Sequence, residues 1–257
     1  MRALLLDVGN TRLKWGVGQD GKIAKTGNIP QQKIREQGVG VLTARLPRNV
    51  DAVMASNVAG PTTATRLAGL IGAHCNTDVH FAKTARSAYG LKNSYAQPRS
   101  MGVDRWVAMI GAWAELHSAC LIVDAGTAVT IDAVNRDGQH LGGQILPGVA
   151  LMARALATDT SDLPRVTPAK TSTYDGLSMF AGNTRNAIQS GALNAVVGAI
   201  ERANKTLRSN AYRPKLVLTG GDASRILPTL DGSPLHRPHL VLQGLLHMLD
   251  VEHNRSQ

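Results

Sequence analysis

One short pattern occurs twice in this chain and constrains its fold more than any other feature. Residues 4–11 read Leu-Leu-Leu-Asp-Val-Gly-Asn-Thr, and residues 121–127 read Leu-Ile-Val-Asp-Ala-Gly-Thr. The two aspartates are 117 residues apart, and a later Asp-Gly pair recurs at the same interval, at 20–21 and 137–138. Each copy reads as a buried strand, a tight turn and a return strand. Two such units at one spacing predict an internal duplication.

The first turn has the composition of an anion-binding loop. Gly9 lets the backbone come close to a ligand, and Asn10 and Thr11 add side-chain and main-chain donors. Asp7, at the carboxyl end of the buried strand, can hold a cation that accompanies a polyphosphate. An ordinary hairpin with a solvated aspartate explains this copy equally well. The second copy favours two loops that face each other and hold a polyphosphate from both sides.

The length of 257 residues suits two domains. We assign residues 1–117 to the first and residues 118–257 to the second. The net charge of +10 is compatible with a nucleic-acid partner, but Lys and Arg are scattered along the chain and form no long basic run. An enzyme that collects anionic substrates has the same charge balance. We favour the enzyme and expect no nucleic-acid partner.

The cysteines, histidines and apolar runs argue against several other classes of protein. Cys75 and Cys120 form no CxxC pair, so we expect two buried, reduced thiols. The histidines form no HExxH motif or other helical ligand pair, which argues against a zinc site. No apolar run approaches the ~20 residues of a membrane span, and no signal peptide is recognisable before Asp7. A cytoplasmic protein without a membrane partner is expected.

Hydrophobic periodicity predicts an α/β chain. Strands are expected at 2–7, 11–18, 22–27, 51–56, 79–81 and 215–219, with a second meander over 119–147. Helices are expected at 31–46, 62–71, 106–116, 149–157 and 184–207, and a polar connector at 158–183. Residues 83–101 show no apolar period, and a loop of that length inside a compact domain is usually functional.

Two polar residues stand where predicted helices begin. Asp104 precedes the apolar helix at 106–116, where it can be a helix cap, a catalytic carboxylate, or both. Asn183 or Thr184 is expected to cap the helix at 184–207. The alanine-rich apolar face of that helix suits close packing within one chain or between two chains.

Four motifs, in this order and spacing, resemble the type III pantothenate kinases, and the lineage also named Bvg accessory factor looks closest. They are Asp-x-Gly-Asn-Thr at 7–11, Gly-x-Asp-Arg at 102–105, Asp-x-Gly-Thr at 124–127 and Thr-Gly-Gly-Asp at 219–222. The family belongs to the superfamily of acetate and sugar kinases, heat-shock chaperone ATPases and actin. The resemblance implies an actin-like ATPase fold, with two duplicated ribonuclease-H-like domains around a nucleotide cleft. It also implies ATP-dependent phosphorylation of pantothenate to 4'-phosphopantothenate, the first step of coenzyme A biosynthesis.

The resemblance further implies roles for individual residues. Asp104 matches the general base, and Asp124 matches a site for a monovalent cation, K⁺ or NH₄⁺. Mg²⁺ is expected near Asp7, held through water. Thr184 matches a substrate contact supplied across a homodimer. The implied ATP- and phosphate-binding residues are Asp7, Val8, Gly9, Asn10, Thr11, Arg12, Leu13, Lys14 and Thr127, and the implied pantothenate-binding residues are Tyr95, Gly102, Val103, Asp104, Arg105 and Thr184.

The chemistry of phosphoryl transfer agrees with these residues, because it depends on positioning and charge neutralisation. Lys14 would bind phosphate, and Arg105 suits a bidentate pair with the carboxylate of pantothenate. Two other functions remain open at this point. One is a non-catalytic regulatory or DNA-associated factor on the same fold, and the other is a superfamily kinase with another small hydroxyl substrate. The complete set of motifs favours the pantothenate kinase.

Overall fold

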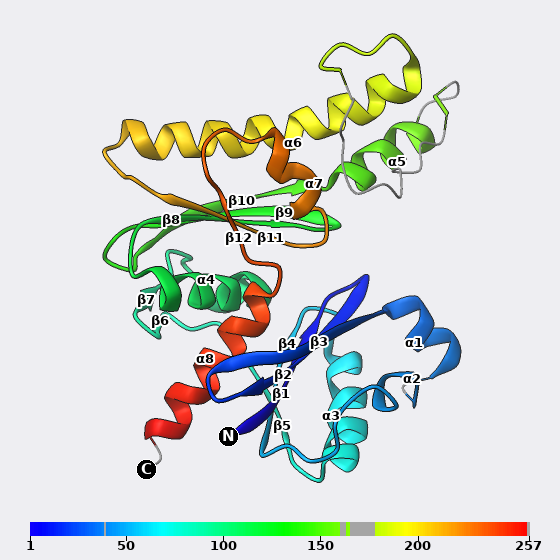
Figure 1. Ribbon diagram of the computed structural model, residues 1–257, viewed down its shortest axis with the longest axis vertical. Coiled ribbons are helices and arrows are strands. Elements are labelled where there is room, and N and C mark those ends of the chain that lie inside the picture. The colour runs from blue at the N-terminus through cyan, green and yellow to red at the C-terminus, as the bar shows by residue number, and fades with distance from the viewer. Residues whose placement is uncertain (39, 160–162, 165–177, 256–257) are drawn as a thin grey trace. The chain divides into compact units, whose positions relative to one another are not determined.

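The computed structural model describes residues 1–38, 40–159, 163–164 and 178–255 (Figure 1). The chain divides into two compact units, one of Met1–Glu115 with His239–Gln257 and one of Leu116–Pro238. Helix α8 (Leu240–Arg255) packs against the sheet of the first unit.

Each unit contains a five-stranded sheet, and the two sheets have equivalent strand orders. The orders are β3-β2-β1-β4-β5 in the first unit and β10-β9-β8-β11-β12 in the second. In both sheets the central strand pairs antiparallel with the next strand in sequence and parallel with the one that follows the crossover. This repeated topology confirms the predicted duplication. The strands are β1 Arg2–Val8, β2 Arg12–Gln19, β3 Lys22–Pro30, β4 Ala52–Asn57, β5 Val79–Phe81, β8 Cys120–Ala125, β9 Ala128–Val134, β10 His140–Pro147, β11 Lys215–Thr219 and β12 Leu235–His236.

The sheet of the first unit is buried on both faces. Leu4 and Leu6 of β1 belong to a core cluster with Leu67 and Ile71 of α3 (Pro61–Cys75). Leu5 is also fully buried, and strand alternation places it on the opposite face. Helix α8 contacts β1, β2, β3 and β4. The continuous apolar run of β1 is therefore explained by helices on both faces.

Two helices of the first unit approach each other at glycines. A Cβ atom added at Gly244 of α8 would lie 2.1 Å from the carbonyl oxygen of Val107 in α4 (Val103–Leu116). One added at Gly111 of α4 would lie 2.7 Å from the carbonyl oxygen of Leu240. In both cases the added Cβ would meet a backbone atom of a helix. A backbone atom cannot move away by changing rotamer, as a side chain can. Glycine at these two positions is what lets the helices lie so close.

We expect Gly244→Val to lower the free energy of unfolding by about 3 kcal/mol, the upper part of the range for overpacking a core. Urea denaturation measures the change. Gly69→Ala in α3 is the control, because Gly69 is exposed and a Cβ there meets no atom within 4 Å. This control should gain up to about 1 kcal/mol from helix propensity. Equal effects of the two substitutions would show that the α4–α8 contact is looser than described.

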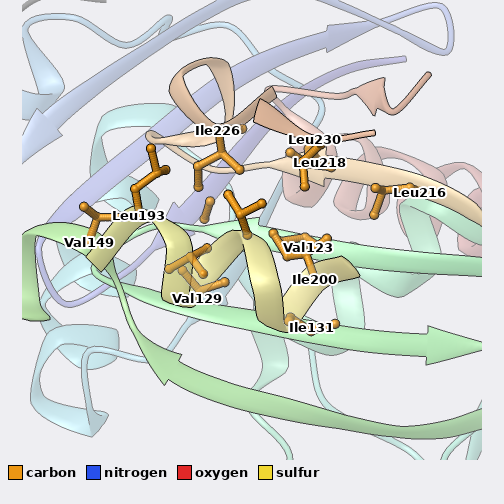
Figure 2. Close-up of a cluster of buried hydrophobic side chains, with 14 of the residues drawn as sticks. Val123, Val129, Ile131, Val149, Leu193, Ile200, Leu216, Leu218, Ile226 and Leu230 are labelled. Atoms are coloured by element: carbon orange, nitrogen blue, oxygen red, sulfur yellow. The ribbon is translucent and has the colours of Figure 1, made fainter. Parts of the chain in front are cut away.

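The core of the second unit lies between its sheet and the long helix α6 (Thr184–Ser209). Figure 2 shows Leu193 and Ile200 of α6 packed with Val123 and Val129 of the sheet, all of them buried. The short helix α7 (Ala223–Ile226) and Leu230 add further apolar side chains to the same cluster. The apolar period predicted for the long helix is therefore used, at least in part, within its own unit. Helix α5 (Val149–Asp159) contacts α6 in this unit.

Two predicted elements differ in detail. The helix expected at 31–46 is two short helices, α1 Gln31–Gln37 and α2 Gly40–Thr43, because Gly38 takes a φ of +79° that ends the first. The loop at 83–101 contains a small hairpin, β6 Ser87–Ala88 and β7 Leu91–Lys92, and a 3₁₀ turn η1 at Pro98–Ser100. A second 3₁₀ turn, η2, follows α7 at Leu227–Thr229. Residues 160–162 and 165–177 of the predicted connector lie outside the described residues.

Both cysteines are buried free thiols, as expected. Burial raises the pKa of Cys120 to about 12 and also raises the pKa of Cys75. Both groups therefore stay protonated near neutral pH, which makes them poor nucleophiles. Within the described residues, none of the helices combines the length and apolar character that crossing a membrane requires.

Candidate active site

The first loop of the duplicated pair connects β1 to β2 in the first unit. Gly9 donates its backbone N–H to the carbonyl oxygen of Arg12 at 3.1 Å, and the side-chain amide of Gln31 donates to the carbonyl oxygen of Gly9 at 3.0 Å. A Cβ at Gly9 would lie 3.2 Å from the Arg12 oxygen, so the turn is tight. Asn10 and Thr11 are exposed at its tip. These two hydrogen bonds therefore fix the base of the loop, while its polar tip is exposed to a ligand.

A carboxylate and an ammonium group stand at the base of this loop. The antiparallel register of β1 and β2 places Asp7 opposite Lys14, and the Lys14 Nζ lies 3.7 Å from Asp7 Oδ2. Asp7 is only 7% exposed, whereas Lys14 is partly exposed. The cation and phosphate roles expected for these two residues stay predictions.

The second loop connects β8 to β9 in the second unit. Gly126 donates its backbone N–H to the carbonyl oxygen of Ala128 at 3.0 Å, the counterpart of the Gly9–Arg12 bond. The carbonyl oxygen of Thr127 accepts the N–H of Gly148 at 2.9 Å. The loop is one residue shorter than the first, since β9 resumes at Ala128. Thr127 is exposed at its tip, which agrees with a contact to an external ligand.

The Thr-Gly-Gly-Asp motif lies against this second loop. Thr219 of β11 is opposite Asp124 of β8, and Asp222 donates its N–H to the carbonyl oxygen of Ala125 at 2.9 Å. Gly220 has a φ of +96°, and a Cβ there would lie 2.4 Å from the Ala125 oxygen and 2.5 Å from Asp124 Oδ1. Only glycine fits this position, and it leaves a carboxylate oxygen and a carbonyl oxygen grouped together.

Asp222, the last residue of that motif, is partly buried. Burial raises the pKa of its carboxyl group, and the guanidinium of Arg225, 3.2 Å away, acts in the opposite direction. Asp222 precedes α7 but makes no side-chain cap bond there.

The expected substrate residues Tyr95 and Arg105 are brought together in the first unit. Arg105 Nη1 donates to the hydroxyl oxygen of Tyr95 at 2.9 Å, and the guanidinium carbon lies 5.6 Å from the centre of the ring. Arg86 donates to the carbonyl oxygens of Tyr95 and Ala96, each at 2.7 Å. Asn93 Oδ1 accepts the N–H of Tyr95 at 2.9 Å. Sequence reasoning did not identify Arg86 or Asn93, although the length of this loop indicated a functional segment.

Asp104 lies inside helix α4 rather than at its cap. The helix begins at Val103, and the backbone N–H of Trp106 bonds to the carbonyl oxygen of Gly102. Asp104 Oδ1 accepts the backbone N–H of Arg105 at 2.8 Å, and the residue is half-buried. The structure thus places the carboxylate in the first helical turn, where the helix dipole favours its ionised form.

The long helix of the second unit is capped by Asn183. Its Oδ1 accepts the backbone N–H of Asn186 at 2.9 Å. Thr184 is the exposed first residue of α6, so it is free of the capping role.

A pocket of about 580 Å³ opens beside Gly102 and Val103 in the first unit. Asn57 and Val58, at the end of β4, line its other side. Val58 also donates its backbone N–H to the carbonyl oxygen of Val8 at 3.0 Å. One backbone segment therefore connects the pocket to the first loop. The first unit brings together the first loop, Tyr95 and the segment 102–105, while Asp124, Thr127 and Thr184 belong to the second unit.

Comparison with known proteins decides the family. A family model described as type III pantothenate kinase matches residues 3–206. This chain belongs to that family. The type III pantothenate kinase of Nitrosococcus oceani is 36% identical over 248 residues, which cover 94% of this chain and 91% of that protein. The one from Herminiimonas arsenicoxydans is 39% identical over 251 residues, which cover 94% of this chain and 95% of that protein.

Solved structures support the fold of this type III pantothenate kinase family member. A conserved Campylobacter jejuni protein described as a Baf family transcriptional activator aligns with a TM-score of 0.61 at 22% identity, over 98% of this chain and 99% of that one. At that identity the likeness shows the fold alone. The expected architecture, with two duplicated ribonuclease-H-like domains of the actin-like ATPase kind, is confirmed.

As a member of a kinase family, the chain has an ATP-dependent activity that needs a divalent metal. The described residues contain no group of three or more His, Cys, Asp or Glu side chains that could hold a metal ion.

Proposed function

We propose that this protein transfers the γ-phosphoryl group of ATP to the primary hydroxyl of pantothenate. The product is 4'-phosphopantothenate, and the reaction is the first step of coenzyme A biosynthesis. Membership of the type III pantothenate kinase family over residues 3–206 carries the proposal. The motifs that resemble those of the family also lie close together within each unit, and this supports the proposal. A cytoplasmic location is part of the same proposal, because ATP and the later enzymes of such a pathway are found there.

In the proposed reaction the two loops bind the phosphates of ATP. Residues 8–13 of the first loop, the ammonium of Lys14 and the hydroxyl of Thr127 supply the contacts. Asp104 accepts the proton of the attacking hydroxyl, while Tyr95, Gly102, Val103 and Arg105 surround the substrate. The bond from Arg105 to the Tyr95 hydroxyl supports this grouping, because it holds the aromatic side chain beside the segment that carries Asp104.

Two cations complete the proposed site. Asp7 suits Mg²⁺, held mainly through water, since it supplies a single buried carboxylate beside the phosphate loop. Asp124 suits a monovalent cation, K⁺ or NH₄⁺, because one carboxylate and the neighbouring Ala125 carbonyl oxygen form an oxygen donor set of low charge. When bound, these ions neutralise the charge of the phosphate oxygens and so lower the barrier to transfer.

Gly220 provides a test of the cation site. Gly220→Ala would push against the oxygens of Asp124 and Ala125 and strain a backbone that has a positive φ. We expect the rate at fixed K⁺ to fall about 10-fold or more, because electrostatic groups positioned around the phosphates contribute strongly. Steady-state assays over a K⁺ titration measure it. Gly221→Ala is the matched control, since a Cβ there meets no atom within 4 Å, and equal losses in both variants would contradict the proposed site.

A homodimer is the proposed assembly, with Thr184 completing the pantothenate site of the other subunit. Large apolar side chains of the second unit are exposed near the start of α6: Phe180 is 88% and Met179 66% exposed. Ile145 of β10 is 64% exposed, and Leu151 and Leu156 of α5 are also exposed. Exposed apolar side chains in such number are typical of protein–protein contact surfaces. They support an interface formed by this unit.

The regulatory alternative predicts tight binding to DNA. Our proposal instead expects only weak, sequence-blind association caused by the net charge of +10. That association should disappear near physiological salt, because binding to the phosphate backbone weakens steeply with ionic strength. Fluorescence anisotropy with labelled duplexes over a salt series measures it. A tight, sequence-specific complex that resists salt would favour the regulatory function.

A coupled assay of ADP release tests the proposed function. The purified protein is incubated with ATP, Mg²⁺ and K⁺, with pantothenate or with other small hydroxyl compounds such as glycerol and glucose. We expect turnover that depends on pantothenate. Turnover with another alcohol but not with pantothenate would indicate a different superfamily kinase. No turnover above the control without enzyme would refute a kinase function.

A further inference from the structure

The pocket beside Gly102 has a positively charged wall. Lys83, which follows β5, and Arg99, in the η1 turn, both line it. Both residues are exposed, and their neighbours Thr84 and Ser100 add hydroxyl groups to the same wall. Among the described residues, the pocket lining contains no Asp or Glu. The wall therefore presents two cationic groups and hydrogen-bond donors to whatever the pocket holds.

The pocket is next to the proposed general base. A Cβ added at Gly102 would lie 2.7 Å from Asp104 Oδ1, so the carboxylate of Asp104 is directly against a lining residue. The volume of about 580 Å³ is in the usual range for a small-molecule site.

Arg105, the residue first expected to pair with the carboxylate of pantothenate, is already engaged. It is only 6% exposed, and its Nη1 donates to the Tyr95 hydroxyl. Its cation also lies over the Tyr95 ring. A buried arginine with these contacts is well suited to hold Tyr95 in place. Lys83 and Arg99 are exposed, so they are more accessible cationic partners for the carboxylate of a substrate.

We infer that Lys83 and Arg99 bind the carboxylate of pantothenate and so determine substrate specificity. This inference rests on the proposed function, because it assigns the two ends of pantothenate to one pocket. The primary hydroxyl lies at Asp104 and the carboxylate at the Lys83–Arg99 wall. Arginine and lysine together suit this role, since a guanidinium can form paired bonds to a carboxylate and an ammonium adds a point charge. The wall rejects neutral analogues because they leave both cations without a counter-charge.

The test compares pantothenate with pantothenol, in which a neutral alcohol replaces the carboxylate. For Lys83→Gln/Arg99→Gln we expect kcat/KM with pantothenate to fall about 30-fold, mainly through a higher KM, because two charge-assisted contacts are lost. With pantothenol the change should be about threefold at most, since that ligand makes neither contact. Arg35→Gln/Arg66→Gln is the matched control, because it removes the same net charge from exposed positions outside the pocket.

Several results would overturn the inference. Equal losses with both compounds would show a structural effect, and an equal loss in the control would show general electrostatic attraction. If Arg105→Gln lost the preference for pantothenate over pantothenol while the double variant kept it, Arg105 would be the partner of the carboxylate.

If the wild type phosphorylates neither compound, the proposed function fails, and calorimetric titration then tests the pocket separately. Binding of pantothenate that is lost in the double variant would support the pocket, and absence of any preference over pantothenol would refute it.

Discussion

Asp104→Asn is expected to lower kcat by about 10²–10⁴-fold, the usual effect of removing a general base. The amide has nearly the same shape as the carboxylate but cannot accept the proton of the attacking hydroxyl. Its side-chain oxygen can still accept the backbone N–H of Arg105, as Asp104 Oδ1 does at 2.8 Å. Folding and ATP binding should therefore be almost unchanged. Steady-state kinetics, thermal unfolding and nucleotide titration together measure the three properties.

Asp20→Asn is the matched control for this substitution. Asp20 is exposed in the turn between β2 and β3, with a φ of +52° that asparagine also tolerates. It should keep wild-type activity. If Asp104→Asn also kept wild-type activity, the carboxylate would have only a structural role at the start of α4. If it lost activity together with stability, the kinetic result would carry no information about proton transfer, and Asp104→Glu would then separate the two effects.

Mixing Asp104→Asn with Thr184→Arg is expected to restore activity that neither protein has alone. Thr184 is exposed at the start of α6, so an arginine there should fold and yet fill a pantothenate site to which that threonine belongs. In a mixed dimer with shared sites, one site carries both lesions and the other carries neither. Random exchange between equal amounts should give about a quarter of the wild-type rate, by two-fold symmetry. Kinase assays after subunit exchange measure it.

Exchange must be shown independently, for example by energy transfer between differently labelled subunits. Asp104→Asn labelled in two colours and mixed with itself is the control, and it should exchange without gaining activity. Mixtures of the two variants that exchange but stay inactive would refute a site shared between subunits. A protein that remains monomeric at assay concentrations would refute the dimer itself.

The duplication and the positions of the motifs could be predicted from sequence because they depend on local patterns. The apolar run before Asp7 and its repeat before Asp124 specify a central strand and a glycine turn without reference to the rest of the chain. The register then follows, and it places Lys14 opposite Asp7. The parallel pairing of β11 with β8 brings Gly220 against Asp124. The motif positions came from the sequence, whereas these two contacts within the units came from the strand pairing.

Other features depend on contacts between distant parts of the chain, and no local pattern predicts them. Helix α8 joins the first unit because Gly244 fits against Val107, well over a hundred positions earlier. The loop at 83–101 lacks an apolar period, because polar contacts organise it. Arg86 and Asn93 hold the backbone around Tyr95, and each could equally be an ordinary surface residue by sequence. Asp104 was considered as a cap of the helix predicted at 106–116, but α4 begins at Val103, so Asp104 lies within its first turn.

The most direct test of the account is to identify the product. Purified protein, ATP, Mg²⁺, K⁺ and pantothenate are incubated, and the phosphorylated product is examined by proton-coupled phosphorus NMR. Transfer to the primary hydroxyl gives a phosphorus signal split into a triplet by the adjacent methylene protons, and this is the result that we predict. A doublet, which indicates transfer to the secondary hydroxyl, or the absence of any new phosphoester would contradict the account.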